Sequence, residues 1–302
     1  MAGASGLERV REFRFRPLDK PEELRAAEEL ERQAMGGGTE VPVNVSVLRG
    51  ALDHGGLVVG AFADIYLAGV GADLLGWNGS ELYRFALLTA VRPEYQHHQV
   101  AYRLMAYRRE AALQQGIPAM RWNFDPLRSR AARLSLRRLG ARCEKYLPHH
   151  LGRLGWKEEE EMDSDRLRMR WGLNEPEVEA RLAGTVPTGA EDLAAYQSAR
   201  SVVRTEENDQ GLRVPTEVGE PAGPLAHLEI PFDLSAVREH DLPSARRWRY
   251  AVRDAFRACT DLGYAPVDFL VLPLEHERRA FYLLRPTPPA SGGGPAAPSP
   301  PK

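Results

Sequence analysis

Two pairs of adjacent histidines, His97-His98 and His149-His150, are the side chains here that most readily suggest metal or proton chemistry. Neighbouring side chains on a strand point to opposite faces, so an adjacent pair rarely binds one ion. No acid stands at a metal-ligand spacing from either pair. We therefore expect no metal site, and we expect His97 and His98 to be solvated loop residues.

A second feature is a junction between a predicted strand and a predicted helix. The strand covers residues 82–90 and ends before Pro93. The helix is predicted from about His98 to Gln115, where Gly116 ends it. Functional groups at such a junction would be presented by the loop and by the first turn of the helix.

This junction resembles the GNAT acyltransferase superfamily, in which a Val-x-Pro-x-Tyr strand end precedes Gln/Arg-x-x-Gly-x-Gly/Ala at a helix start. This chain has Val91-Arg-Pro-Glu-Tyr and then Gln96-His-His-Gln-Val-Ala. The resemblance implies that backbone N–H groups and the helix dipole bind the pyrophosphate of acetyl-CoA or another acyl-CoA. Gln99 stands at the usual glycine position, where a side chain could crowd the phosphates. The donor-binding residues that the resemblance implies are Ala90, Val91, Gln96, His97, His98, Gln99, Val100 and Ala101.

Further motifs extend the resemblance to a long GNAT family of bacteria and archaea, over about residues 11–284. Its members have Asn residues where this chain has Ala131 and Ser135, and a tyrosine where it has Leu151. Loss of that tyrosine removes a phenol that could protonate the leaving thiolate. The motifs that carry the resemblance are Arg121-Trp-Asn-Phe-Asp-Pro-Leu, Leu136-Arg-Arg-Leu-Gly-Ala, Ser164-Asp-Arg-Leu-Arg-Met-Arg-Trp, Ile230-Pro-Phe, and Ala245-Arg-Arg-Trp-Arg with Phe256.

The resemblance implies direct acyl transfer from a CoA thioester to an amine. A backbone N–H of the strand over residues 85–91, near Ala90 and Val91, would stabilise the oxyanion. That strand contains no acid or histidine. Asp125 precedes Pro126, which is more typical of a turn than of a base. The weak candidates for general acid or base are Glu81, His98, Asp125 and His149.

The predicted function is therefore N-acyltransfer of an acetyl or succinyl group to the amine of a small molecule, with an amino acid as one candidate. The departures at Gln99, Ala131 and Leu151 leave a second hypothesis open, a GNAT-fold binding or scaffold protein that has lost catalysis. Acyl-CoA is the expected donor, and a homodimer is left open.

Composition limits the partners. The chain has 302 residues, 40 Lys and Arg and 42 Asp and Glu, so its net formal charge of −2 argues against a dedicated nucleic-acid binder. Cys143 and Cys259 lie far apart, which excludes a disulfide framework. No signal-like apolar run begins the sequence, and acids interrupt the apolar stretch 56–77. We expect a cytoplasmic protein with neither a nucleic-acid nor a membrane partner.

A basic stretch lies between residues 128 and 142 and contains six arginines. Arg130, Arg133 and Arg137 would share one face of an α-helix. We interpret this face as solvated, with contact to CoA phosphates or an anionic substrate as the alternative.

The predicted fold class is α+β, a GNAT fold with a mixed, mainly antiparallel sheet flanked by helices and a C-terminal β-α-β extension. The expected domains are a GNAT domain over 11–175, a partly irregular connecting segment over 176–224, a docked extension over 225–285, and a disordered Pro/Gly-rich tail over 286–302. Strands are predicted at 13–18, 57–62, 66–77, 82–90, 120–124, 143–147, 167–173, 228–231, 267–272 and 280–284, and helices at 20–35, 43–52, 98–115, 128–138, 190–200 and 244–262.

Overall fold

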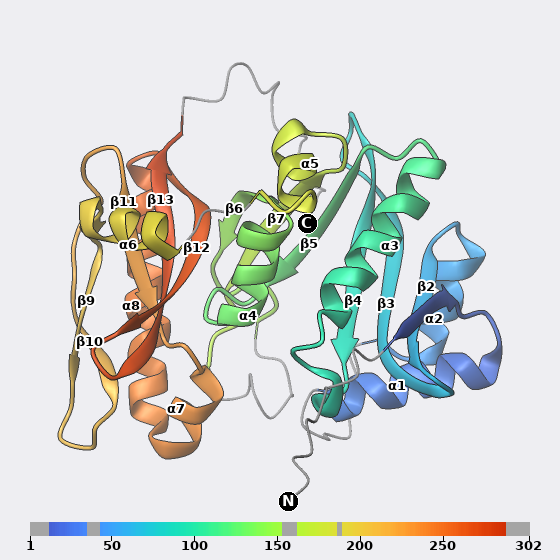
Figure 1. Ribbon diagram of the computed structural model, residues 1–302, viewed down its shortest axis with the longest axis horizontal. Helices are drawn as coiled ribbons and strands as arrows, with labels where there is room; N and C mark the ends of the chain where they lie inside the picture. The colour runs from blue at the N-terminus through green and yellow to red at the C-terminus, as the bar shows by residue number, and fades with distance from the viewer. Residues whose placement is uncertain (1–11, 35–42, 153–161, 186–188, 288–302) are drawn as a thin grey trace, which may run out of the picture. The chain divides into compact units, whose positions relative to one another are not determined.

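The structure of the chain is a computed structural model, and it describes residues 12–34, 43–152, 162–185 and 189–287. The chain divides into two compact units, residues 1–118 and 119–302, and each unit is described by itself (Figure 1). The expected disordered tail lies outside the described residues, apart from Pro286 and Thr287.

Unit 1, residues 1–118, is built on an antiparallel sheet in which strands that follow one another in the chain pair, in the order β1-β2-β3-β4. Its elements are β1 (Phe13–Pro17), α1 (Pro21–Ala34), α2 (Val45–Asp53), β2 (Leu57–Ala63), β3 (Tyr66–Trp77), β4 (Leu82–Val91), a 3-10 helix (Pro93–Tyr95) and α3 (Val100–Gln114). Apart from the 3-10 helix, these are the elements predicted from the sequence, with bounds that differ by a few residues.

Helices cover both faces of this sheet. Val58 and Val59 are neighbours in β2, so their side chains point to opposite faces. Val58 packs in a cluster with leucines of α1 and α2, whereas Val59 packs with Val100 and Leu104 of α3. α1 and α2 therefore lie on one face and α3 lies on the other.

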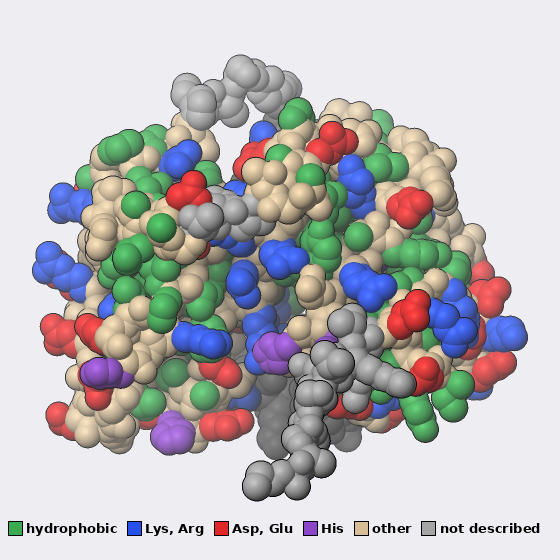
Figure 2. All heavy atoms as spheres, in the orientation of Figure 1, with side chains coloured by type: hydrophobic (Ala, Val, Ile, Leu, Met, Phe, Trp, Pro, Cys, Tyr) green, Lys and Arg blue, Asp and Glu red, His purple; other side chains and the backbone are tan. Residues whose placement is uncertain are grey.

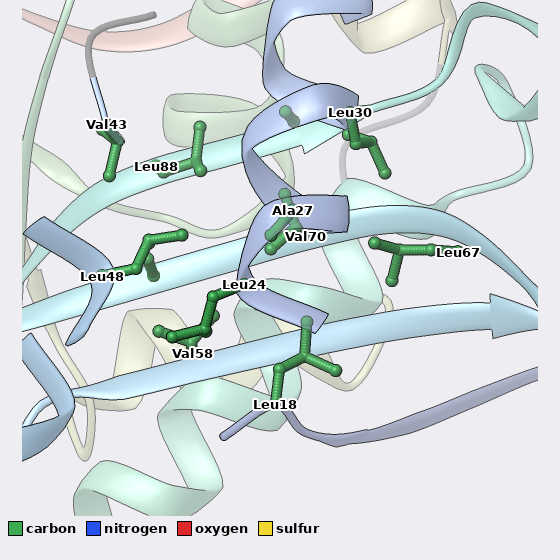
Figure 3. Packing of buried hydrophobic residues seen from close by; sticks show 12 residues of the cluster. Leu18, Leu24, Ala27, Leu30, Val43, Leu48, Val58, Leu67, Val70 and Leu88 are labelled. Atoms are coloured by element: carbon green, nitrogen blue, oxygen red, sulfur yellow. The ribbon is translucent and has the colours of Figure 1, made fainter. Parts of the chain in front are cut away.

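Figure 3 shows the cluster beneath α1, where Leu24, Ala27 and Leu30 point toward the strands. Leu24 and Leu30 have no exposed surface, and each such leucine contributes about 1.5–3 kcal/mol to folding. This packing fixes α1 against β3 and β4.

Gly69 of β3 permits the close approach of α3. A Cβ atom there would lie 2.8 Å from a methyl carbon of Val100 and 3.2 Å from the carbonyl oxygen of Ala90. Only glycine fits this spacing without a shift, so Gly69 sets the position of the N-terminus of α3 beside the end of β4.

The described part of unit 2, residues 119–302, contains three separate groups of paired strands. β5, β7 and β6 pair antiparallel in that order, β9 and β10 form a hairpin, and β12, β13, β11 and β8 form a four-stranded sheet. β8 and β11 are parallel. The elements are β5 (Ala119–Phe124), α4 (Ser129–Ala132), a π-helix (Arg133–Arg138), β6 (Arg142–Leu147), β7 (Arg166–Gly172), α5 (Pro176–Leu182), α6 (Gly189–Ser198), β8 (Arg200–Ser201), β9 (Val203–Glu207), β10 (Arg213–Val218), β11 (Ala226–Ile230), α7 (Leu234–His240), α8 (Leu242–Asp261), β12 (Tyr264–Leu274) and β13 (Glu277–Pro286).

The prediction of an α+β fold with mixed, mainly antiparallel pairing is confirmed. The segment 176–224 has more regular structure than the sequence predicts, because it contains α5, α6 and β8–β10. The hairpin β9–β10 is short and mostly polar, so it has little of the alternation that marks a strand. The domain boundaries at 175 and 224 stay predictions.

The structure also differs from the predicted single helix over 128–138. After the short α4, the N–H of Leu139 donates to the carbonyl of Leu134, a π-helical bond that spans five residues. Arg137 is therefore buried, and its guanidinium binds Asp268 at 2.8 Å and also binds Asp192. The interpretation of Arg130, Arg133 and Arg137 as one solvated face is wrong for Arg137, because the wider turn rotates it inward.

Figure 2 shows side chains of both charges scattered among apolar ones, in keeping with the small net charge. Among the helices that the structure describes, none combines the length and apolar character that crossing a membrane requires. In the described ranges, no three His, Cys, Asp or Glu side chains are grouped as metal ligands would be.

Candidate functional site

A β-bulge interrupts β4 three residues before the expected oxyanion position. Leu88 pairs with Ala72 of β3 and Ala86 pairs with Asp73, so Leu87 is an extra residue on β4. A bulge leaves one residue outside the regular ladder and re-aims the backbone around it. From Leu88 to Val91 the strand pairs regularly with β3 again, so the bulge separates the end of β4 from the rest of the strand.

The loop after β4 has an unusual backbone. The N–H of Arg92 donates to Ala68 at 3.0 Å and the N–H of Gln96 donates to Pro93 at 3.2 Å, which fixes the 3-10 turn. His97 has φ 71° and Gln99 has φ 59°, both in the left-handed region that favours glycine. Gln99 thus differs from the glycine of the GNAT motif in side chain only, since its backbone has a conformation that glycine adopts easily.

The N-terminus of α3 presents donors beside this loop. In the part of the chain that the structure describes, the N–H groups of Val100 and Ala101 have no hydrogen-bond partner, as is usual in a first turn. Left-handed residues that alternate with others, as at His97 and Gln99, form concave backbone sites for anions. His97, His98 and Gln99 are exposed, so solvent reaches the loop.

Phe13 of β1 holds the loop in place. Its ring meets Tyr95 edge-on at 6.0 Å and His98 at 6.4 Å, and its carbonyl accepts a bond from Arg103 of α3 at 3.2 Å. Val100 is buried against the same cluster. The loop and the helix N-terminus are therefore anchored to the sheet on which β4 lies.

Glu31 is a residue that the sequence analysis missed. It lies in the last turn of α1, is 2% exposed and accepts a hydrogen bond from the N–H of Val43. Its pKa is raised to about 7, mainly by burial and also by the charge of Glu28, against the lowering effect of the Val43 bond. Glu31 stands seven residues after Leu24, which is two helical turns along the same face. This spacing is the sequence signal from which the burial of Glu31 could have been predicted.

The four candidate acids and bases are divided between the two units. Glu81 lies before β4 at the end opposite the loop, about 30 Å along the strand from Val91. His98 lies in the loop itself. Asp125 and His149 belong to unit 2, so they are described with that unit.

Asp125 forms an ion pair with Arg249. Its carboxylate accepts bonds from both terminal nitrogens of Arg249 on α8, one at 2.8 Å, and from the N–H of Leu127 at 2.8 Å. Burial by itself raises the pKa of Asp125, but the charge and hydrogen bonds of Arg249 outweigh it and the net pKa is lowered. Asp125 is thus a poor proton acceptor, and it holds α8 at the end of β5.

A second buried carboxylate, Asp165, holds α8 at the start of β7. It has no exposed surface and accepts bonds from Arg253 at 2.7 and 3.0 Å and from the Tyr146 hydroxyl at 2.6 Å. Burial and the bond to Asp165 raise the pKa of Tyr146, so its phenol stays protonated. The motif residues Asp125 and Asp165 therefore act in packing α8 against β5 and β7.

His149 and Leu151 lie near the surface of unit 2. His149 has φ 49°, is about half exposed, and its Nδ1 lies 3.1 Å from Asp163. Leu151 is exposed, and its N–H donates to the Ser164 hydroxyl at 2.9 Å. The position at which the sequence comparison expected a tyrosine therefore has an exposed apolar side chain. Ser135 is buried and accepts a bond from Trp122 at 3.1 Å, whereas Ala131 is half-buried.

No family model matches the sequence, and no curated protein matches it. The solved structures that align with the chain are GNAT acetyltransferases, over about half of its length at low identity. One is an acetyltransferase assigned to the GNAT family from Desulfovibrio desulfuricans, with 20% identity, 54% of this chain and 99% of that chain covered, and a TM-score of 0.42. The Escherichia coli ribosomal-protein-S18-alanine N-acetyltransferase has 13% identity, coverage of 54% and 96%, and a TM-score of 0.45. The PaiA N-acetyltransferase of Thermoplasma acidophilum, solved with coenzyme A, has 17% identity, coverage of 53% and 99%, and a TM-score of 0.40.

Proposed function

We propose that the protein is an N-acyltransferase that moves an acetyl or succinyl group from acyl-CoA to the amine of a small molecule of the amino-acid type. The observation that carries this proposal is the junction of β4 and α3, where the motif residues 96–101 form a loop with left-handed backbone at His97 and Gln99. Free N–H groups at the start of a fifteen-residue helix suit a pyrophosphate.

The residues of unit 1 fit this donor. Val100 and Ala101 would donate their N–H groups to the phosphates, and the exposed side chain of Gln99 does not fill a buried space there. The bulge at Leu87 and the strand end at Ala90 and Val91 would direct a backbone N–H at the thioester oxygen. CoA supplies the activated thioester, and the chain orients it and stabilises the oxyanion.

Gln99→Gly tests whether the departure from the family matters. The backbone is already left-handed, so we expect the affinity for acetyl-CoA to stay within about tenfold, or about 1.4 kcal/mol. Relief of the left-handed conformation should raise the stability by about 1 kcal/mol. Calorimetric titration and thermal unfolding measure the two effects. Acetyl-CoA binding that appears only after the substitution would show that the natural chain has lost the donor site.

Ala101→Asp should remove donor binding without unfolding α3. An aspartate in the first turn interacts favourably with the helix dipole, but its charge occupies the position proposed for a phosphate. We expect acceptor-dependent release of free thiol from acetyl-CoA, measured with a panel of amino acids and small amines, to fall at least tenfold. Gln114→Glu adds the same charge at the other end of the helix and should have no effect on this rate.

A binding or scaffold protein without catalysis is the second candidate, because Asp125 is ion-paired and Leu151 is exposed. The same assay separates the two functions. Tight binding of acetyl-CoA with no thiol release for any amine would favour the binding protein.

A further inference from the structure

One face of the paired strands β5, β7 and β6 in unit 2 is rich in arginine. In β7, arginines alternate with apolar residues that have no exposed surface, so the arginines point to the other face of the strand. These arginines are Arg166, Arg168 and Arg170. The central one, Arg168, has Asn123 of β5 and Lys145 of β6 as its cross-strand partners. Arg168 therefore has an amide on one side and a second cation on the other.

The charge at the centre of this face is not neutralised. The next arginine along β7, Arg170, binds Glu175 at 2.6 Å. In the part of unit 2 that the structure describes, no salt bridge and no side-chain hydrogen bond includes Arg168 or Lys145. Arg168 is partly buried, so solvent ions screen its charge less than they would at a fully exposed site. Because like charges directly opposite each other on two strands repel, an anion between them would stabilise this arrangement.

His150 adds a hydrogen-bond donor to this cluster. Its Nε2 atom accepts a hydrogen bond from the amide of Asn123 at 3.3 Å, and Asn123 is the cross-strand neighbour of Arg168. The proton of the neutral ring is therefore on Nδ1, which can donate to a ligand. Burial lowers the pKa of His150, and the positive charges of Arg168 and Arg166 lower it further, so the ring is neutral at pH 7.

We infer that Arg168, His150 and Lys145 form a binding site for the carboxylate of a small molecule. The guanidinium of Arg168 has parallel N–H donors that match the two oxygens of a carboxylate. The Nδ1–H of His150 is a further donor, and the exposed Lys145 adds charge at the rim. One partly buried arginine matches the single charge of a carboxylate better than the charge of about −2 on a phosphate monoester. This site goes beyond the proposed function, because binding here does not depend on acyl transfer.

Calorimetric titration tests this site with the proteinogenic L-amino acids, with short mono- and dicarboxylates, and with the primary amides of these compounds as uncharged controls. We expect saturable one-site binding of at least one carboxylate at pH 7. Its amide should bind more weakly by about tenfold or more, and so should the carboxylate itself to Arg168→Gln. Arg142→Gln is the matched control, because Arg142 is an exposed arginine of β6 that pairs with Glu175 at 3.5 Å. This control should bind the carboxylate as the wild type does.

The ring of His150 provides a second measurement. Arg168→Gln removes a positive charge that acts on this ring, so the pKa of His150, measured by NMR titration, should rise in this variant and not in Arg142→Gln. A bound carboxylate should raise the same pKa in the wild type. The thermal unfolding temperature of Arg168→Gln should be no lower than that of the wild type, because no salt bridge of the described residues is lost.

Three results would overturn the inference. The first is a wild-type protein that binds none of these carboxylates, or that binds them no better than Arg168→Gln does. The second is a lower unfolding temperature of Arg168→Gln, which would show that Arg168 has a structural role. The third is inorganic phosphate that binds through Arg168 more tightly than any carboxylate, which would make this a phosphate site. Failure to bind acetyl-CoA would contradict the proposed function alone and would leave this site unaffected.

Discussion

Replacing Arg253 by methionine is expected to lower the free energy of unfolding by about 3–5 kcal/mol. The substitution removes the guanidinium that binds Asp165 at 2.7 and 3.0 Å and leaves this carboxylate, which has no exposed surface, without its cation. The Tyr146 hydroxyl and the backbone N–H of His149 would still donate to Asp165, but neutral donors do not offset a buried charge. Urea denaturation at pH 7 measures the loss.

Arg204→Met is the matched control for this effect. Arg204 pairs with Glu217 at 2.9 Å, but both side chains are more than half exposed, so the pair should contribute less than about 1 kcal/mol. An Arg253→Met variant that loses no more stability than Arg204→Met would contradict the assignment of Asp165 and Arg253 as an anchor of α8.

Glu31→Gln is expected to stabilise the protein above neutral pH by about 3 kcal/mol. Burial raises the pKa of Glu31 from its ordinary value of 4.5 to about 7 in the folded chain. Because the folded pKa is the higher one, the associated stability is complete below pH 4.5 and is lost as the pH rises through 7. Because glutamine stays neutral, the Glu31→Gln variant keeps this stability above neutral pH.

Urea denaturation at pH 5 and at pH 8.5 measures this difference. The two proteins should be alike within about 1 kcal/mol at pH 5, and the glutamine variant should be the more stable one at pH 8.5. Glu29→Gln should show no such change with pH, because Glu29 is exposed and binds Arg32. Equal stability of wild type and Glu31→Gln at pH 8.5 would contradict the buried, unpaired state of Glu31.

The elements of unit 1 could be predicted because local signals fix their ends. Pro93 ends β4 and Gly116, with φ 71°, follows the end of α3, so the junction and its motif could be placed from the sequence. The left-handed backbone of Gln99 could not be placed in this way, since glutamine rarely adopts it. Glu31 could have been found from its spacing to Leu24, but its burial depends on the packing of α1.

Unit 2 was harder to predict for physical reasons. Asp125 and Arg249 are 124 residues apart in the chain, and Asp165 and Arg253 are 88 apart, so neither pair has a local signal. The π-helix that turns Arg137 inward has no mark in the sequence that separates it from an α-helix. Asp125 was named as a weak candidate base, and only its contact with Arg249 shows its structural role.

Calorimetric titration of acetyl-CoA into the wild-type protein and into Ala101→Asp tests the central claim most directly. We expect saturable one-site binding to the wild type and an affinity at least tenfold weaker for Ala101→Asp, because the donors are the N–H groups at the start of α3. Wild-type protein that binds no acetyl-CoA, or two proteins that bind it equally well, would contradict a donor site at the junction of β4 and α3.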